Sequence, residues 1–421
     1  MADRFLTQRT AATDIVLAVR NLEKTFTAKK GPAVQALRDV SLDALRGRVT
    51  GLVGADGAGK TTLIRTAAGL IVPTAGSVTV LGLDSVIDTI EIQSRVGYMP
   101  QKFGLYQDLT VKENMDLYAD LQGVPFSDRK YRYQRLLKMT GLEPFTRRMA
   151  GALSGGMKQK LGLACSLIKS PEMLLLDEPT VGVDPVSRRE LWKIVYELVE
   201  KDGIGVLVST AYLDEAEKCD HVVVLHEGTL LAEGTSRHFK EQVAGKVALV
   251  DPPTGTKPRH IYTHLAGRDH IVDATIRSGR VRVVTDNSAR KVVSEALLPQ
   301  LAATVDDASP NFEDAFMTLI PQKERRFKLN TSDISIKKAV REEDVVVQTK
   351  GLRKYFGSET IVVVEPDSSY SKVIDQMKLL NPEADEILSS CRIAVNEEFV
   401  NLDETMKSED TLFLIPPSSG G

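Results

Sequence analysis

The residues that most directly indicate chemistry form a short glycine-rich run, GADGAGKTT. Its glycines can turn backbone N–H groups inward around phosphate oxygens, because a residue without a side chain adopts conformations closed to others. Lys60 adds a mobile positive charge, and the hydroxyl of Thr61 is suited to a magnesium ion. The candidate phosphate-binding residues are Gly54, Ala55, Asp56, Gly57, Ala58, Gly59, Lys60, Thr61 and Thr62.

Such a run predicts phosphate binding only when it lies between a strand and a helix. The apolar residues Val49, Leu52 and Val53 precede it, as expected of a buried strand, and the segment LIRTAAGL after it has helical spacing. An ordinary glycine-rich turn with a lone lysine does not explain this order. We therefore expect a strand, a phosphate-binding loop and a helix in succession.

Two neighbouring carboxylates, Asp177 and Glu178, follow the apolar segment MLLL. Acidic residues are common at strand ends, so the pair alone is weak support for a site. Beside a phosphate loop, however, such a strand end places Asp177 near the loop's Mg²⁺ and leaves Glu178 able to polarise a water molecule. The pair therefore predicts a metal ligand and a general base.

A second candidate anion site opens the segment LSGGMKQKLGLACSLIKS. Ser154 is suited to cap a helix, and Gly155 and Gly156 leave the N–H groups of its first turn free. The free N–H groups at the start of a helix attract anions. We expect this turn to be an anion site.

The segments Asp14–Phe26 and Ala33–Leu45 alternate apolar and polar residues, as strands with one solvated face do. They should pack beside the strand that precedes the phosphate loop. Phe26 ends the first segment, where a flat adenine ring could stack on it. An ordinary core residue of an edge strand explains Phe26 equally well, so both interpretations stay open.

The composition indicates a globular chain of two or three domains, with 421 residues, 42% hydrophobic and 26% charged, and a formal net charge of -3. This charge gives no indication of nucleic acid as a partner. The three cysteines, Cys165, Cys219 and Cys391, form no paired spacing and favour a reducing compartment. No apolar run approaches the ~20 residues of a membrane-spanning helix, so we expect a cytoplasmic chain whose membrane role requires a partner.

Several motifs in fixed order resemble the nucleotide-binding subunits of ATP-binding-cassette transporters. They are GADGAGKTT, the glutamine Gln101 of YMPQKFGLYQDLT, LSGGMKQK, LLLDEP, and VGVDP with Asp184. The resemblance covers residues 14–235 and implies an α/β phosphate-loop cassette. Such a cassette has a mixed sheet core, an antiparallel β-subdomain and a helical subdomain, here expected over residues 111–170.

The resemblance also implies a mechanism with ATP and Mg²⁺ as cofactors. Lys60 and Thr61 would hold phosphate and metal, Asp177 would support the metal, and Glu178 would be the base. Gln101 would sense the nucleotide and its metal, and Asp184 would join the catalytic set. Ser154, Gly155 and Gly156 would bind the ATP of a second cassette in a homodimer or heterodimer. Membrane permease subunits are the implied partners, at the inner face of the membrane.

One position departs from the family pattern. Where the family usually carries a histidine after the strand that follows the base, this chain has Ala211 in STAYLDEAE. Alanine has no group that can hold the γ-phosphate or orient a water molecule. We therefore expect this site to bind ATP and hydrolyse it slowly. The signature segment LSGG is intact, so the site that it completes on a partner could still be fast.

The residues beyond the cassette fall into three parts. A strand-rich extension ends in SPNFEDAFMTLI and resembles the tail of cassette subunits that serve export permeases. A charged linker follows, and then a segment in which Phe356 matches Phe26, as at the start of a second cassette that lacks a phosphate loop. The predicted boundaries are 1–240 for the cassette, 241–321 for the extension, 322–344 for the linker and 345–421 for a last domain.

The last domain resembles the sulfur-carrying small subunit of molybdopterin synthase, a ubiquitin-like β-grasp protein of the α+β class. The resemblance rests on AVNEEFV, the apolar strand LFLIPP and the final Gly420 and Gly421. It implies a terminal thiocarboxylate, and as partners an adenylating or sulfurtransferase enzyme and the large synthase subunit.

Three alternatives remain beside the transport subunit. Sulfur carriage is the main role in the first, and the second is an artefact of gene fusion near residue 359. The third, a cassette protein acting on ribosomes or DNA, is disfavoured because the chain has no heptad stretch and no basic arm.

Overall fold

The computed structural model describes most of the chain up to residue 321 and shorter segments beyond it. The described residues are 14–27, 33–102, 104–296, 303–321, 347–348, 361–362, 369–380, 389, 392–395, 398–399, 401, 403–404 and 412–415. The chain divides into two units, 1–327 and 328–421, which we describe separately. The linker predicted over 322–344 and the residues Phe356, Cys391, Gly420 and Gly421 lie outside the described residues.

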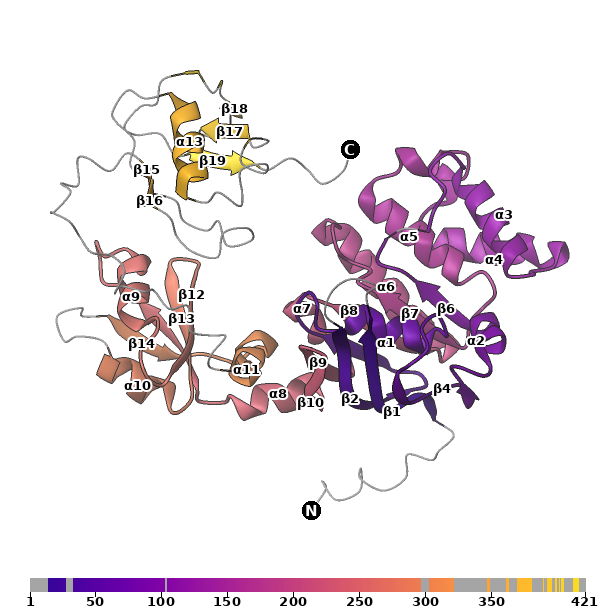
Figure 1. Cartoon of the computed structure of the whole chain (residues 1–421), viewed down its shortest axis with the longest axis horizontal. Coiled ribbons are helices and arrows are strands. Elements are labelled where there is room, and N and C mark those ends of the chain that lie inside the picture. The colour runs from indigo at the N-terminus through magenta and orange to yellow at the C-terminus, as the bar shows by residue number, and fades with distance from the viewer. Residues whose placement is uncertain are drawn as a thin grey trace, which may run out of the picture. The chain divides into compact units, whose positions relative to one another are not determined.

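A mixed sheet forms the centre of the first unit (Figure 1). Its strands, in spatial order, are β10 (Thr229–Gly234), β9 (His221–His226), β3 (Val49–Val53), β8 (Gly205–Thr210), β7 (Met173–Asp177) and β6 (Val96–Met99). Only β10 runs antiparallel to its neighbour. Every residue of β3, β7 and β8 is buried, as continuous apolar strands of a covered parallel sheet should be.

A second, antiparallel sheet holds the amino-terminal strands. Its order is β2 (Val34–Leu45), β1 (Ile15–Phe26), β4 (Ala75–Val80) and β5 (Leu83–Asp84). The two predicted strands are therefore present, but they pair with each other and with β4 instead of with β3. Their buried residues share one core with Leu52 of β3 and Leu63 of α1 (Lys60–Ala67).

Some helices of the first unit begin or end at residues that favour such boundaries. The next helices after α1 are α2 (Thr89–Arg95), α3 (Val111–Leu121), α4 (Phe126–Thr140), α5 (Gly155–Ser166), α6 (Pro185–Asp202) and α7 (Leu213–Ala216), with 3-10 turns at Glu143–Phe145 and Ala150–Ala152. Thr110 and Glu113 form a capping box for α3, and Gly141, with φ 67°, ends α4. None of the helices among the described residues has the length and apolar character that a bilayer span requires.

The extension after α8 (Ser236–Gln242) follows a βαββαβ order, which is the ferredoxin-like arrangement. Its elements are β11 (Val247–Asp251), α9 (Pro258–Leu265), β12 (Ile271–Arg277), β13 (Arg280–Thr285), α10 (Ala289–Ala296) and β14 (Thr304–Asp307). The sheet is antiparallel in the order β12-β13-β11-β14 and has its own apolar core. The sequence indicated the strands but not this topology.

Helix α11 (Phe312–Leu319) joins the extension to the cassette. Phe312 is 1% exposed within the cassette core, where its ring lies 5.2 Å from that of Phe239. Asp314, two residues further along α11, accepts two hydrogen bonds of 2.8 and 2.6 Å from Arg282 of β13. One helix therefore contributes apolar contacts to one part and an ion pair to the other.

The described residues of the second unit have mixed α and β structure. They comprise β15 (Val347–Gln348), β16 (Ile361–Val362), α13 (Tyr370–Leu380), β17 (Arg392–Val395), β18 (Glu398–Phe399) and β19 (Leu412–Ile415). Strands β18, β17 and β19 form one antiparallel sheet. This agrees with the α+β class predicted for the last domain.

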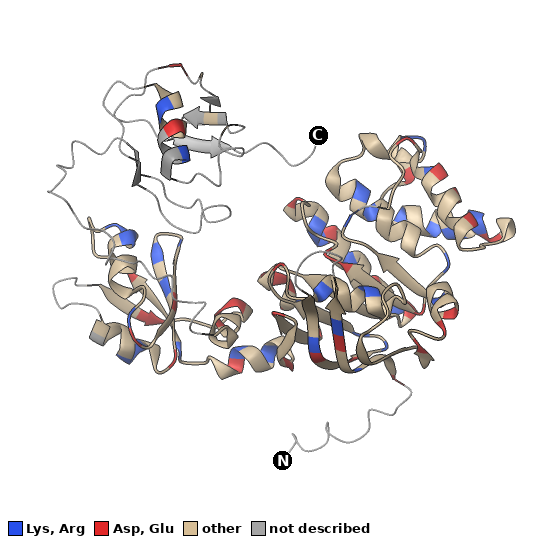
Figure 2. Cartoon of the chain, viewed as in Figure 1, with Lys and Arg blue, Asp and Glu red and all other residues tan. Residues whose placement is uncertain are grey.

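In the first unit, positive and negative side chains are interspersed along the elements (Figure 2).

We predict that Phe312→Ala destabilises the first unit by about 3–5 kcal/mol, because it removes a buried ring from the core that α11 shares with α8. The measurement is the urea dependence of unfolding. Phe126→Ala is the matched control, since Phe126 is 82% exposed and its ring stacks on Arg129, so its loss should cost less than about 1 kcal/mol. Equal losses in the two variants would contradict the role assigned to α11.

Candidate active site

The phosphate loop connects β3 to α1 and depends on glycine at two close approaches. A Cβ atom on Gly54 would lie 2.3 Å from the carbonyl oxygen of Leu225. Gly59 has φ 101°, and a Cβ atom there would lie 2.6 Å from the carbonyl oxygen of Ala36. The loop can therefore keep this shape only with glycine at both positions.

The side chain of Lys60 lies inside this loop. It is 4% exposed, and its Nζ donates to the carbonyl oxygens of Gly54 at 2.8 Å and Ala55 at 3.0 Å. The same Nζ lies 3.1 Å from Oε1 of Glu178, at the end of β7. The structure thus brings the predicted phosphate-binding lysine and the predicted base into direct contact.

Glu178 is held in an unusual backbone conformation, with φ 51°. A non-glycine residue in this region is strained, and the surrounding contacts must hold it there. Its N–H donates to Oγ of Ser209 at 2.9 Å, and its Oε2 accepts from Nε2 of Gln101 at 2.7 Å. Gln101 therefore contacts the predicted base directly.

Asp177, the predicted magnesium ligand, lies beside the loop threonine. Its Oδ1 accepts hydrogen bonds from Thr61 at 3.1 Å and Ser209 at 2.8 Å, while its Oδ2 is buried without a hydrogen-bond partner. Burial raises the pKa of this carboxyl, against the hydrogen bonds from Ser209 and Thr61, which lower it. A buried oxygen ligand left without a partner beside the loop threonine fits Mg²⁺, which prefers carboxylate and hydroxyl oxygens.

The second predicted anion site lies where α5 and α6 begin. Ser154 caps α5 as predicted, accepting from the N–H of Met157 at 3.3 Å. A Cβ atom on Gly156 would lie 2.3 Å from Oγ of Ser187, so the two helix starts are tightly packed. Gly155 faces the same loop, since a Cβ atom there would lie 3.3 Å from the carbonyl oxygen of Gly182.

Asp184 is the residue that caps α6. Its Oδ1 accepts from the N–H groups of Val186 and Ser187, each at 3.0 Å. These hydrogen bonds, that of Ser187 first, lower the pKa of Asp184. Its observed contacts are therefore those of a helix cap at the loop that packs against the Ser154 turn.

The remaining predicted residues differ in exposure. Phe26 ends β1 with 42% of its surface exposed, and Nζ of Lys24 lies 5.0 Å from the ring centroid. Ala58 is 3% exposed and packs into the core below the loop. Ala55, Asp56 and Gly57 are exposed, and Thr62 is half-buried. Ala211 follows β8 directly and is exposed.

Sequence reasoning missed Ser209. Strand β8 lies between β3 and β7, and residue 209 of β8 is the register partner of Asp177. Its hydroxyl therefore contacts both Asp177 and the backbone of Glu178. The available signal was the polar pair, Ser209 and Thr210, that ends the apolar segment GVLVST.

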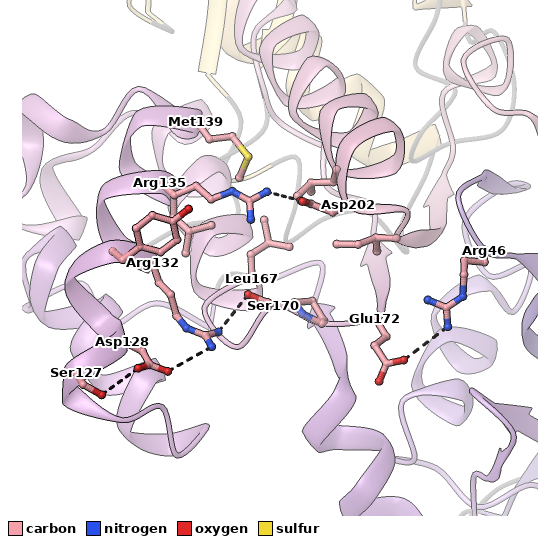
Figure 3. Close-up of a pocket in the computed structure, with 15 residues that line it drawn as sticks. Arg46, Ser127, Asp128, Arg132, Arg135, Met139, Leu167, Ser170, Glu172 and Asp202 are labelled. Atoms are coloured by element: carbon pink, nitrogen blue, oxygen red, sulfur yellow. Dashed lines mark hydrogen bonds and ion pairs between the residues drawn. The ribbon is translucent and has the colours of Figure 1, made fainter.

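A separate cavity of about 560 Å³ contains none of the predicted site residues (Figure 3). Its wall combines apolar side chains, such as Leu167 and Met139, with paired charges. Arg132 donates to Oγ of Ser170 at 3.1 Å and lies 3.7 Å from Asp128. The charges at this cavity are paired within the protein.

Two known families match the chain. The ABC transporter family matches residues 37–181, and the ThiS family matches residues 350–421. One solved structure, described as the ATP-binding subunit of an ABC transporter, is 31% identical with a TM-score of 0.48, and the match covers 54% of this chain and 92% of that one.

Individual relatives match the first part of the chain. The probable multidrug ABC transporter ATP-binding protein YbhF of Escherichia coli (strain K12) is 46% identical over 309 residues, covering 73% of this chain and 52% of YbhF. The chain thus spans about half the length of that relative. The daunorubicin resistance ATP-binding protein DrrA3 of Streptomyces coeruleorubidus is 37% identical over 233 residues, covering 55% of this chain and 72% of DrrA3. The match covers 72% of DrrA3, and the ABC transporter family match over residues 37–181 includes the phosphate loop and the Asp177–Glu178 pair, so the chain belongs to the family of ABC transporter ATP-binding proteins.

Proposed function

We propose that the chain hydrolyses ATP as the motor subunit of an efflux transporter. The observation that carries the proposal is the contact network of Lys60, Glu178 and Gln101, with the Thr61–Asp177 contact beside it. These residues supply a phosphate-binding cation, a base, a sensor and two metal ligands. The printed names of YbhF and DrrA3, a multidrug transporter protein and a drug resistance protein, favour efflux as the purpose.

The reaction would proceed by attack of a water molecule on the γ-phosphate, which breaks the bond to the β–γ bridging oxygen and releases ADP and phosphate. Lys60 exchanges its contacts with the loop carbonyls for phosphate oxygens, which frees the carboxylate of Glu178 from the ammonium group. Glu178 then accepts the proton of the attacking water. A magnesium ion held by Thr61 and Asp177 would neutralise charge on the phosphates. Gln101 follows the position of Glu178 through their hydrogen bond.

The partners we infer are a second cassette and membrane permease subunits. The turn Ser154–Gly156 presents backbone N–H groups at the start of α5, and we infer that it completes the ATP site of a second copy or of a related cassette. Docking on a permease would hold the chain at the cytoplasmic face of the membrane. The chain's match to the ATP-binding part of transporter relatives supports both partners.

A second function is proposed for the last domain because residues 350–421 match the ThiS family. If the mature chain ends at Gly421, its carboxylate would attack the α-phosphate of ATP in an adenylating enzyme and release pyrophosphate. The persulfide of a sulfurtransferase would then displace AMP and form an acyl disulfide. A thiol would attack that disulfide, form a new disulfide with the sulfurtransferase sulfur, and release the thiocarboxylate. The acceptor we infer is the large subunit of molybdopterin synthase.

Glu178→Gln should abolish ATP hydrolysis while ATP binding persists, because the amide cannot accept the proton but can still contact Gln101 and Lys60. The measurements are phosphate release and equilibrium binding of labelled ATP. Glu200→Gln, on the exposed face of α6, is the control and should retain wild-type turnover. Undiminished hydrolysis by Glu178→Gln would remove Glu178 from the role of base.

Ala211→His should raise the turnover of ATP, because an imidazole at the end of β8 can hold the γ-phosphate and orient the water molecule. The comparison is kcat of the variant against that of the wild type, with Ala211→Leu as a control for side-chain size alone. An unchanged kcat in Ala211→His would contradict the inference that this site is slow.

The carrier function should depend on Gly421 and be indifferent to Lys60. Intact-mass analysis after coexpression with an adenylating enzyme and a sulfurtransferase should show a species heavier by the difference between sulfur and oxygen. Deleting Gly421 should abolish that species, and Lys60→Ala should leave it. Its absence from the wild-type chain would overturn the carrier proposal.

A further inference from the structure

The carboxylate of Glu215 on α7 is fully buried and joins three segments around the candidate active site. Its Oε2 accepts from the hydroxyls of Thr180 at 2.9 Å and Thr210 at 2.7 Å, and its Oε1 accepts from the indole N–H of Trp192 at 3.2 Å. The guanidinium of Arg188 is less close, with its Nε 3.8 Å away and without a hydrogen-bond partner. Glu215 thus binds chiefly hydroxyl and indole groups.

Two of these segments border the predicted base and position 211. Thr180 lies two residues after Glu178, in the loop that follows β7. Thr210 precedes Ala211, and its hydroxyl also accepts from the N–H of Tyr212 at 3.0 Å. The Thr210 hydroxyl therefore links the N–H of Tyr212, on the far side of Ala211, to the carboxylate of Glu215.

The third segment leads to the turn that we assign to a second cassette. Trp192 is on α6, and α6 begins at the loop of Asp184 that packs against Gly155 and Gly156. One carboxylate consequently links the loop of the base, the end of β8 and the helix behind the Ser154 turn.

Burying a carboxylate in this place is costly unless its hydrogen bonds are satisfied. An apolar residue would fill the space between α6, α7 and the strand ends without that cost. The backbone of Glu178 is strained, with φ 51°, and a conformation of this kind persists only when neighbouring contacts hold it. The hydrogen bond from Thr180 to the carboxylate of Glu215 is such a contact.

We propose that Glu215 is a positioning residue for ATP hydrolysis. It holds the loop of Glu178 and the residue at position 211 at a fixed separation through Thr180 and Thr210. It touches neither the phosphate loop nor the predicted metal ligands, so it acts on the placement of the base and not on nucleotide binding. This inference rests on the proposed ATPase function.

The test compares steady-state ATP hydrolysis by the full-length wild type and Glu215→Gln. An amide places a donor where the carboxylate accepts, so the base loop shifts and kcat should fall about 10- to 100-fold. The KM for ATP should change less than about threefold, because Lys60, Thr61 and Phe26 keep their contacts. Equal loss in kcat and nucleotide binding, together with a lower Tm, would show a merely structural role and overturn the proposal.

Thr180→Val and Thr210→Val each remove one hydrogen bond to Glu215 without altering its carboxylate. These two variants test the proposal if Glu215→Gln fails to fold. Each should lower kcat with little change in KM. The double variant Glu215→Gln with Thr180→Val should lose no more activity than Glu215→Gln alone, since both changes break one link. Fully additive losses, or threonine variants with wild-type kcat, would contradict the proposal.

Glu217→Gln is the matched control, because Glu217 follows α7 directly but accepts from the backbone of Phe312 instead of from the site. It should retain wild-type kcat. Trp192, the only tryptophan in the sequence, supplies a spectroscopic signature, and its fluorescence should change in Glu215→Gln but not in Glu217→Gln. A wild-type chain that does not hydrolyse ATP would refute the proposed function itself, whereas an active wild type with an equally active Glu215→Gln would refute only this inference.

Discussion

The whole site depends on the contact between Lys60 and Glu178, two nearly buried groups of opposite charge from separate strand ends. The contact exists because β3 and β7 are parallel and end at the same edge of the sheet, with β8 between them. A charge placed there is shielded from water, and each interaction with it is stronger than it would be at the surface. Any shift of β7 against β3 would separate the phosphate-binding cation from the base.

Strand β8, which lies between β3 and β7, also holds the site residues in place. Ser209 of β8 donates to Asp177 and accepts from the backbone of Glu178, so the metal ligand and the base share one support. The next residue, Thr210, donates a hydrogen bond to the buried carboxylate of Glu215 on α7. The two polar residues that end β8 thus set the geometry on both sides of the site.

The phosphate loop could be predicted from sequence because its strand, loop and helix are contiguous and each has a local signal. The strands of the amino-terminal sheet could also be located, but not their pairing with β4, since partner choice depends on the burial of whole faces. The ferredoxin-like strand order of the extension could not be predicted for the same reason. Ser209 and Glu215 were missed because their roles come from contacts between segments distant in sequence, which no local spacing encodes. The catalytic role that the resemblance implies for Asp184 stays a prediction, and its observed contacts are those of a helix cap.

The most direct test of this account is equilibrium binding of labelled ATP to the purified wild-type chain, with and without Mg²⁺, beside the Lys60→Ala variant. We expect tight retention by the wild type that requires Mg²⁺ and is lost in Lys60→Ala. Failure of the wild type to retain nucleotide in the presence of Mg²⁺, or equal retention by Lys60→Ala, would contradict the assignment of the edge formed by β3, β7 and β8 as the ATP site.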